Sequence, residues 1–166
     1  GNDSMDGGDI TDRVAYTDRN VLTYKADATS GVYIDLTGIV GDGSFGHGTV
    51  HDGQGGVDTV TNVNFIVGST FDDTIVGSSA FIFEQFEGST GNDYIHGGAL
   101  RDTLNNVDSN RANFQNASSA ETIDLGLGTA TGGDGTRYNL ETDLRAFEGS
   151  YIAKDGSRHQ GAFALI

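Results

Sequence analysis

The chain has 166 residues and a formal net charge of −15, and it contains 26 Gly but no Pro, Cys or Trp. A charge of this sign argues against a nucleic-acid partner, because Lys and Arg are what bind the phosphate backbone. The absence of Cys excludes a disulfide framework, and no apolar stretch approaches the roughly 20 residues that span a bilayer.

The first half of the chain is predicted to consist of short strands between tight turns. Abundant Gly favours turns that need positive φ, and turn-dense chains of this length are usually all-β. In a recurring motif, an Asp precedes an apolar residue by two positions, as in Asp73-Thr74-Ile75. Because alternate strand residues face the same side, the apolar members are expected to form one core stripe. These residues are Met5, Val14, Val60, Ile75, Ile95 and Leu104.

The second half of the chain repeats the first. Residues 91–98 (GNDYIHGG) answer residues 1–8 (GNDSMDGG) at a distance of 90 positions. A repeat of this kind predicts one module built from two degenerate units, about 1–80 and 81–166. Within the second unit, residues 105–119 are Asn-rich and aperiodic and are predicted to be a long loop, whereas residues 139–147 are predicted to be a strand.

The acidic residues are unevenly divided, since 19 of the 24 are Asp. Asp is compatible with turns, and its carboxylate is a hard oxygen ligand of the kind that calcium prefers. Gly-rich turns would add backbone carbonyl oxygens, which also bind calcium. The pattern is therefore consistent with calcium-binding turns, or with Asp and Asn side chains that only close Asx turns.

These phrases resemble the RTX (haemolysin-type) calcium-binding repeat, whose nonapeptide reads G-G-x-G-x-D-x-U-x with U a large apolar residue. Residues 1–5 fit its fourth to eighth positions, and residues 7–15 match at four positions with Ile10 in place of the third Gly. Residues 91–95 and 97–104 match the nonapeptide at the corresponding positions, with Leu100 in place of the third Gly. The resemblance covers most of residues 1–105 and, more weakly, 120–155.

The resemblance implies a right-handed parallel β-roll or β-helix, a solenoid with calcium in Gly/Asp-rich turns. In that family, an ion lies between loops one full turn apart, so Asp73 and Asp93, which are 20 residues apart, are the preferred pair. Asp3 and Asp12 are expected to lie on opposite edges. The full set of implied calcium ligands is Asp3, Asp12, Asp58, Asp73, Asp93, Asp102, Gly1, Gly7, Gly91 and Gly97.

The implied function is that of a structural module, secreted by bacteria as part of a larger exported protein through a type I system, whose folding is coupled to calcium. We expect a monomer without enzymatic activity. The alternative is a carbohydrate-binding accessory module of a polysaccharide-modifying enzyme or adhesin, with an extracellular polysaccharide as partner. A groove of exposed Tyr together with Arg or Lys would favour this alternative, and Tyr33, Tyr94 and Tyr138 are the candidate tyrosines.

Two other constellations are set aside. His47 and His51 resemble a zinc or copper pair, but without a third clustered ligand a solvated Gly-rich loop is expected instead. Asp72 and Asp73 could suggest a glycosidase, yet adjacent strand residues face opposite ways and would not flank one bond.

Overall fold

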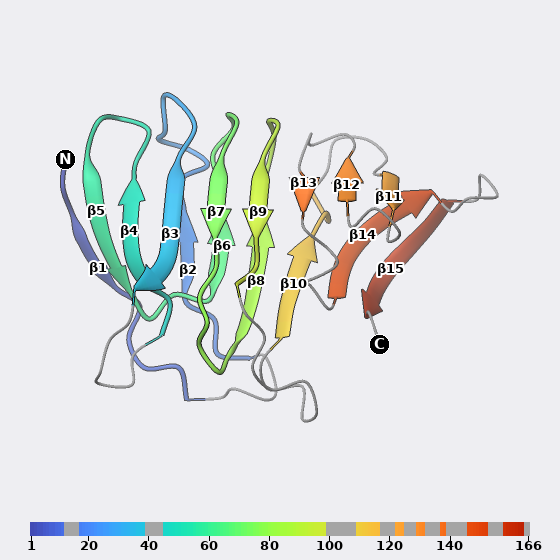
Figure 1. Cartoon of the computed structure of the whole chain (residues 1–166), viewed down its shortest axis with the longest axis horizontal. Coiled ribbons are helices and arrows are strands. Elements are labelled where there is room, and N and C mark those ends of the chain that lie inside the picture. The colour runs from blue at the N-terminus through green and yellow to red at the C-terminus, as the bar shows by residue number, and fades with distance from the viewer. Residues whose placement is uncertain are drawn as a thin grey trace.

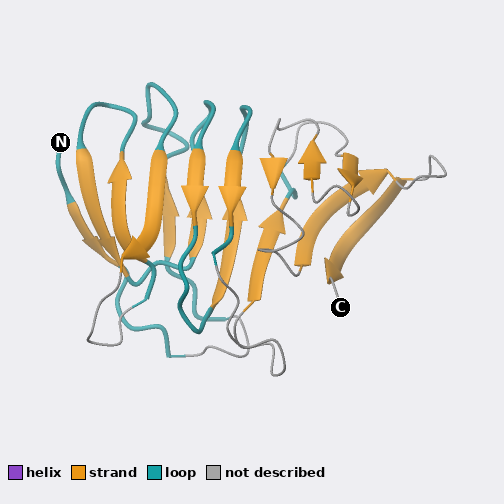
Figure 2. Cartoon of the chain, in the orientation of Figure 1, coloured by secondary structure: helices purple, strands orange, loops and turns teal. Residues whose placement is uncertain are grey.

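The computed structural model describes the side chains of residues 1–11, 17–38, 45–98 and 110–116. It describes the backbone alone for Ser109 and for residues 122–124, 129–131, 137–138, 146–152 and 158–164. All regular structure in these ranges is strand and none is helix (Figure 2). The prediction of an all-β chain is thus confirmed for the described part.

The strands form two large sheets and one small pair. Sheet A contains, in spatial order, β1 (Ser4–Asp6), β5 (Val57–Thr61), β4 (His47–His51), β3 (Tyr33–Gly38), β7 (Thr74–Val76), β9 (Tyr94–His96) and β13 (Arg137–Tyr138). Sheet B contains β15 (Arg158–Ala164), β14 (Ala146–Ile152), β10 (Ser109–Asn113), β8 (Phe83–Glu87), β6 (Phe65–Val67) and β2 (Val21–Thr23). The small pair joins β11 (Thr122–Asp124) to β12 (Thr129–Thr131).

Between β6 and β10 the chain alternates between the two sheets. β6, β8 and β10 are parallel neighbours in sheet B, while β7 and β9 are parallel neighbours in sheet A. Sheet B accordingly lies behind sheet A in Figure 1. Each strand is short because a turn must carry the chain across to the other layer.

The predicted right-handed parallel β-roll is wrong, because sheet A is mixed and neither sheet closes. β4 runs antiparallel to both β3 and β5. The turn at 52–56 causes this reversal: Asp52 Oδ1 accepts hydrogen bonds from the backbone N–H groups of Gln54 and Gly56, both at 2.8 Å. A closed turn of this kind joins antiparallel neighbours, whereas parallel neighbours need a crossover.

Two local predictions are also wrong. His47 and His51 lie at the two ends of strand β4 instead of in a loop. The segment 105–119 contains β10, which pairs in parallel with β8 and β14. The strand predicted at 139–147 lies largely outside the described residues, and β14 begins at Ala146.

The core lies between the two sheets. Sheet A contributes Val60, Ile75 and Ile95, each with 0% of its surface exposed, and sheet B contributes Ile66 and Phe86. The first three confirm the predicted core stripe, and Met5 packs against the same cluster at its edge. Val14 and Leu104 lie outside the described residues. Alternate residues of sheet A point outward, so its strands show the alternating burial of a half-buried sheet.

In the described part of the chain, no helix has the length and apolar character needed to cross a membrane.

Candidate functional site

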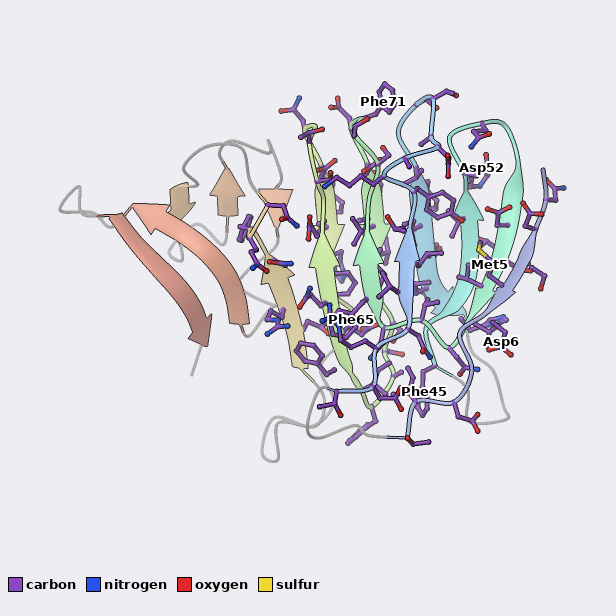
Figure 3. The ribbon with its side chains drawn as sticks, turned by 180° about the vertical axis from the view of Figure 1, so that it is seen from behind. Met5, Asp6, Phe45, Asp52, Phe65 and Phe71 are labelled. Atoms are coloured by element: carbon purple, nitrogen blue, oxygen red, sulfur yellow. The ribbon has the colours of Figure 1, made fainter. Side chains whose placement is uncertain are left out.

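Five loops stack side by side along one edge of sheet A, and we call them the loop column. It contains residues 1–3, 52–56, 28–32, 68–73 and 88–93, in spatial order. Figure 3 shows Asp52 and Phe71 at this edge, with Asp6 and Phe45 toward the opposite one. Hydrogen bonds join successive loops, for example from Thr29 Oγ1 to the Gly53 carbonyl oxygen at 2.8 Å.

Glycine permits the close approach of these loops. A Cβ at Gly31 would overlap the carbonyl oxygen of Asp72, and a Cβ at Gly91 would overlap that of Phe71. Gly91 also has a φ of +130°, which other residues rarely adopt. The Gly residues of the repeat therefore serve to bring carbonyl oxygens and carboxylates of neighbouring loops together.

Asp73 is a buried carboxylate of the loop column that accepts three hydrogen bonds. Its Oδ1 accepts hydrogen bonds from Val32 N–H at 2.8 Å and from the Ser69 hydroxyl at 2.6 Å, while its Oδ2 accepts one from Ser69 N–H at 2.6 Å. Only 2% of Asp73 is exposed, and this burial raises the pKa of its carboxyl above the usual value although the hydrogen bonds oppose the shift. All three donors are neutral, so the carboxylate joins loops 28–32 and 68–73 without an ion pair.

Asp93 occupies the matching place one loop further along. Its Oδ1 accepts a hydrogen bond from Asp73 N–H at 2.9 Å, and only 2% of the residue is exposed. On the solvent side, Asp72 Oδ1 accepts a hydrogen bond from Asn92 N–H at 2.8 Å. The structure therefore brings Asp73, Asp93 and Gly91 together, as the spacing of 20 residues predicts, and it places Asp72 and Asp73 on opposite sides.

Asp58 makes an equivalent contact with the first loop. Its Oδ1 accepts a hydrogen bond from Asp3 N–H at 2.9 Å, and its Oδ2 accepts one from the Tyr24 hydroxyl at 2.8 Å. Burial, followed by this bond to Asp58, raises the pKa of Tyr24 well above its usual range. Gly1 also lies against loop 52–56, since a Cβ at Gly56 would overlap the Gly1 carbonyl oxygen.

Two further predicted ligands, Gly7 and Gly97, lie outside the loop column. Gly7 donates its N–H to the Thr61 carbonyl oxygen at 3.0 Å, at the opposite end of the strands. Gly97 lies at that end too, where its carbonyl oxygen accepts a hydrogen bond from the Asn110 side chain. Asp12 and Asp102 lie outside the described residues. The eight predicted ligands in the described part of the chain therefore do not gather in one place.

Sequence reasoning missed three partners of these carboxylates, namely Val32, Ser69 and Tyr24. Ser69 had a local signal, because a Ser four residues before an Asp can bond to it within one turn. Val32 and Tyr24 had none, since they lie 41 and 34 positions from the Asp residues that they contact.

The donors gathered in the loop column are oxygens, a set that suits calcium and not zinc. Among the described residues, no group of three or more His, Cys, Asp or Glu side chains is arranged to hold a metal. An ion bound here would therefore depend on backbone carbonyl oxygens as much as on carboxylates.

Comparisons with protein-family models, with curated proteins and with solved structures found no match.

Proposed function

We propose that the chain is a calcium-stabilised structural module of a longer exported protein. The observation that carries this proposal is the register of loops 68–73 and 88–93, in which Asp93 accepts the N–H of Asp73 directly. Stacked loops that each present a buried carboxylate are what a bridging cation needs. The resemblance of residues 1–105 to RTX repeats supports the same reading.

The residues present fit a calcium ion. Asp73 accepts three hydrogen bonds, and a carboxylate offers about four acceptor positions, so one position on Oδ2 remains for a cation. Asp93 and the carbonyl oxygens of the two loops would supply the other ligands. Bound calcium would supply positive charge between carboxylates that otherwise repel each other in a protein of net charge −15.

The proposal is tested by thermal unfolding of the purified chain in millimolar calcium and in a chelator. A site with a dissociation constant near 10⁻⁴ M would add about 1–2 kcal/mol at millimolar calcium. For a chain of this length, each kcal/mol moves the unfolding midpoint by about 2–4 °C. We therefore expect the midpoint to rise by several degrees for each site that calcium fills.

Two controls separate binding from screening of the acidic surface. Magnesium at the same ionic strength should raise the midpoint less, because it demands a tighter octahedral site. Asp93→Asn should reduce the calcium shift, whereas Asp35→Asn, the same change on the outer face of sheet A, should leave the shift intact. Equal midpoints in calcium and chelator, or equal shifts with calcium and magnesium, would show that the aspartates only accept amide hydrogens.

Calcium dependence also bears on location. The ion is scarce in a bacterial cytosol and abundant outside, so a module with millimolar requirements would fold fully only after export. The proposed role is structural and non-enzymatic: the module gives the parent protein a β-rich segment that is stable only where calcium is present.

A further inference from the structure

The outer face of sheet A carries a row of exposed side chains at one level of the sheet. The residue pairs place Val57, His51, Tyr33, Thr74 and Tyr94 on five consecutive strands. Tyr33, Tyr94 and Val57 are 42%, 44% and 40% exposed. Among the described residues, six large hydrophobic side chains are exposed to this degree, and half of them are in this row.

The two tyrosines are spaced by the sheet itself. Tyr33 is on β3 and Tyr94 on β9, with β7 between them, so two strand intervals of about 4.8 Å put their attachment points about 9.5 Å apart. A linear oligosaccharide is long enough to lie across both rings. Aromatic faces attract the C–H groups of a pyranose ring, and the Tyr hydroxyl adds a polar contact at the ring edge.

One end of the row is already ordered. The rings of Tyr33 and His51 meet edge to face, with centroids 5.9 Å apart and an angle of 73° between their planes. Such a pair restricts the rotamers of both residues before any ligand arrives, which reduces the entropy lost on binding. Hydrogen-bonded strands hold the five residues of the row in register, so the row presents an extended line of side chains.

The adjacent row supplies hydrogen-bonding groups. Thr59, Thr49 and Asp35 pair across β5, β4 and β3, and their side chains point to the same outer face. The Thr hydroxyls can accept from and donate to sugar hydroxyls, and the Asp35 carboxylate can accept from them. On β3, β4, β5, β7 and β9 these two rows contain no Lys or Arg. The first row adjoins one cationic residue, since Arg137 on β13 pairs with Tyr94, but the chain as a whole carries a net charge of −15. An anionic polymer would be repelled here, so charge selects a neutral one.

We propose that this outer face binds a neutral polysaccharide, with Tyr33 and Tyr94 as stacking platforms. The row lies next to the loop column, since Tyr33, Thr74 and Tyr94 each directly follow one of its loops, so calcium is kept in every binding assay to hold the fold constant. Binding would attach the module, and the protein that carries it, to a glycan surface.

Affinity electrophoresis in native gels tests this directly. The gels would contain hydroxyethyl cellulose, dextran or galactomannan as neutral probes and alginate as an anionic one, with calcium in every buffer. We expect at least one neutral probe to retard the chain and alginate to have no such effect. Tyr33→Ala and Tyr94→Ala should each weaken retardation by about ten-fold, while Tyr33→Phe should keep most of it because the stacking face remains.

Phe81→Ala is the matched control, because Phe81 is 42% exposed but lies in the turn before β8, away from this face. It should leave retardation unchanged, and circular dichroism would show that every variant keeps its fold. The proposal is overturned if no neutral probe retards the chain, if alginate is preferred, or if the Tyr variants bind as wild type does. Concentration-dependent dimers in sedimentation that disappear in the Tyr variants would also overturn it, by assigning the face to a second copy.

Discussion

Replacing Asp73 by Asn tests whether a buried carboxylate fixes the loop column. Asn keeps one oxygen, which can still accept from Val32 N–H and from the Ser69 hydroxyl. Its amide nitrogen takes the place of Oδ2 and would face Ser69 N–H, so that a donor meets a donor where a 2.6 Å hydrogen bond now stands. The substitution therefore changes one buried bond and leaves two in place.

The size of the effect follows from that one bond. A buried N–H left without an acceptor costs about 1–3 kcal/mol. Removing the charge also removes the desolvation that raises the pKa of Asp73, which offsets part of this cost. We expect Asp73→Asn to lower the free energy of unfolding by about 1–3 kcal/mol, and the thermal midpoint by roughly 2–12 °C.

Urea unfolding followed by circular dichroism measures this difference, with Asp72→Asn as the control. Asp72 is exposed and accepts from Asn92 N–H through one oxygen, which Asn also has. This variant should stay within about 0.5 kcal/mol of wild type. If Asp72→Asn cost as much as Asp73→Asn, general charge effects and not the buried contacts would control stability, and the reasoning would fail.

Three further outcomes are expected. Because burial raises the pKa of Asp73 in the folded state, its stabilising contribution is complete below the unfolded pKa and is lost as pH rises through the folded pKa. The difference in free energy of unfolding between wild type and Asp73→Asn should therefore increase as pH falls from about 7 to about 4. Urea titrations across this range would contradict the reasoning if the difference decreased. Tyr24 also has a raised pKa, so wild type should lose stability above pH about 10 and Tyr24→Phe should lose less, which alkaline melts would reveal. Gly91→Ala should lower the free energy of unfolding by about 1–3 kcal/mol more than Gly55→Ala in the same denaturation assay. Both glycines have positive φ, but only at Gly91 would the added methyl overlap a carbonyl oxygen, that of Phe71. Equal losses would mean that the loops can move apart.

Local chemistry made part of this fold predictable. The phrase Asp-x-apolar placed Val60, Ile75 and Ile95 in the core, because alternation along a strand is decided within three residues. The spacing of Asp73 and Asp93 likewise predicted that they would be neighbours, since loops of equal length return to the same edge.

The direction of β4 was not predictable in this way. Residues 46–51 are rich in Gly and His and carry no strand signal of their own, so they form a strand only because β3 and β5 lie on either side. The role of Asp73 was equally hidden. A Gly-shaped turn with an Asp does not reveal which amides its carboxylate will accept, and one of the donors to Asp73 is the N–H of Val32, 41 positions away.

The pairing of β1 has a mechanical consequence. β1 is attached to sheet A by three residue pairs with β5, the strand at 57–61, and among the described strands it is the edge of the sheet. A pulling force on the N-terminal end would reach these pairs first and could detach β1 while the antiparallel strands β3, β4 and β5 keep their own hydrogen bonds. In single-molecule force measurements the module should then yield in at least two steps, a small early extension followed by rupture of the remaining sheets.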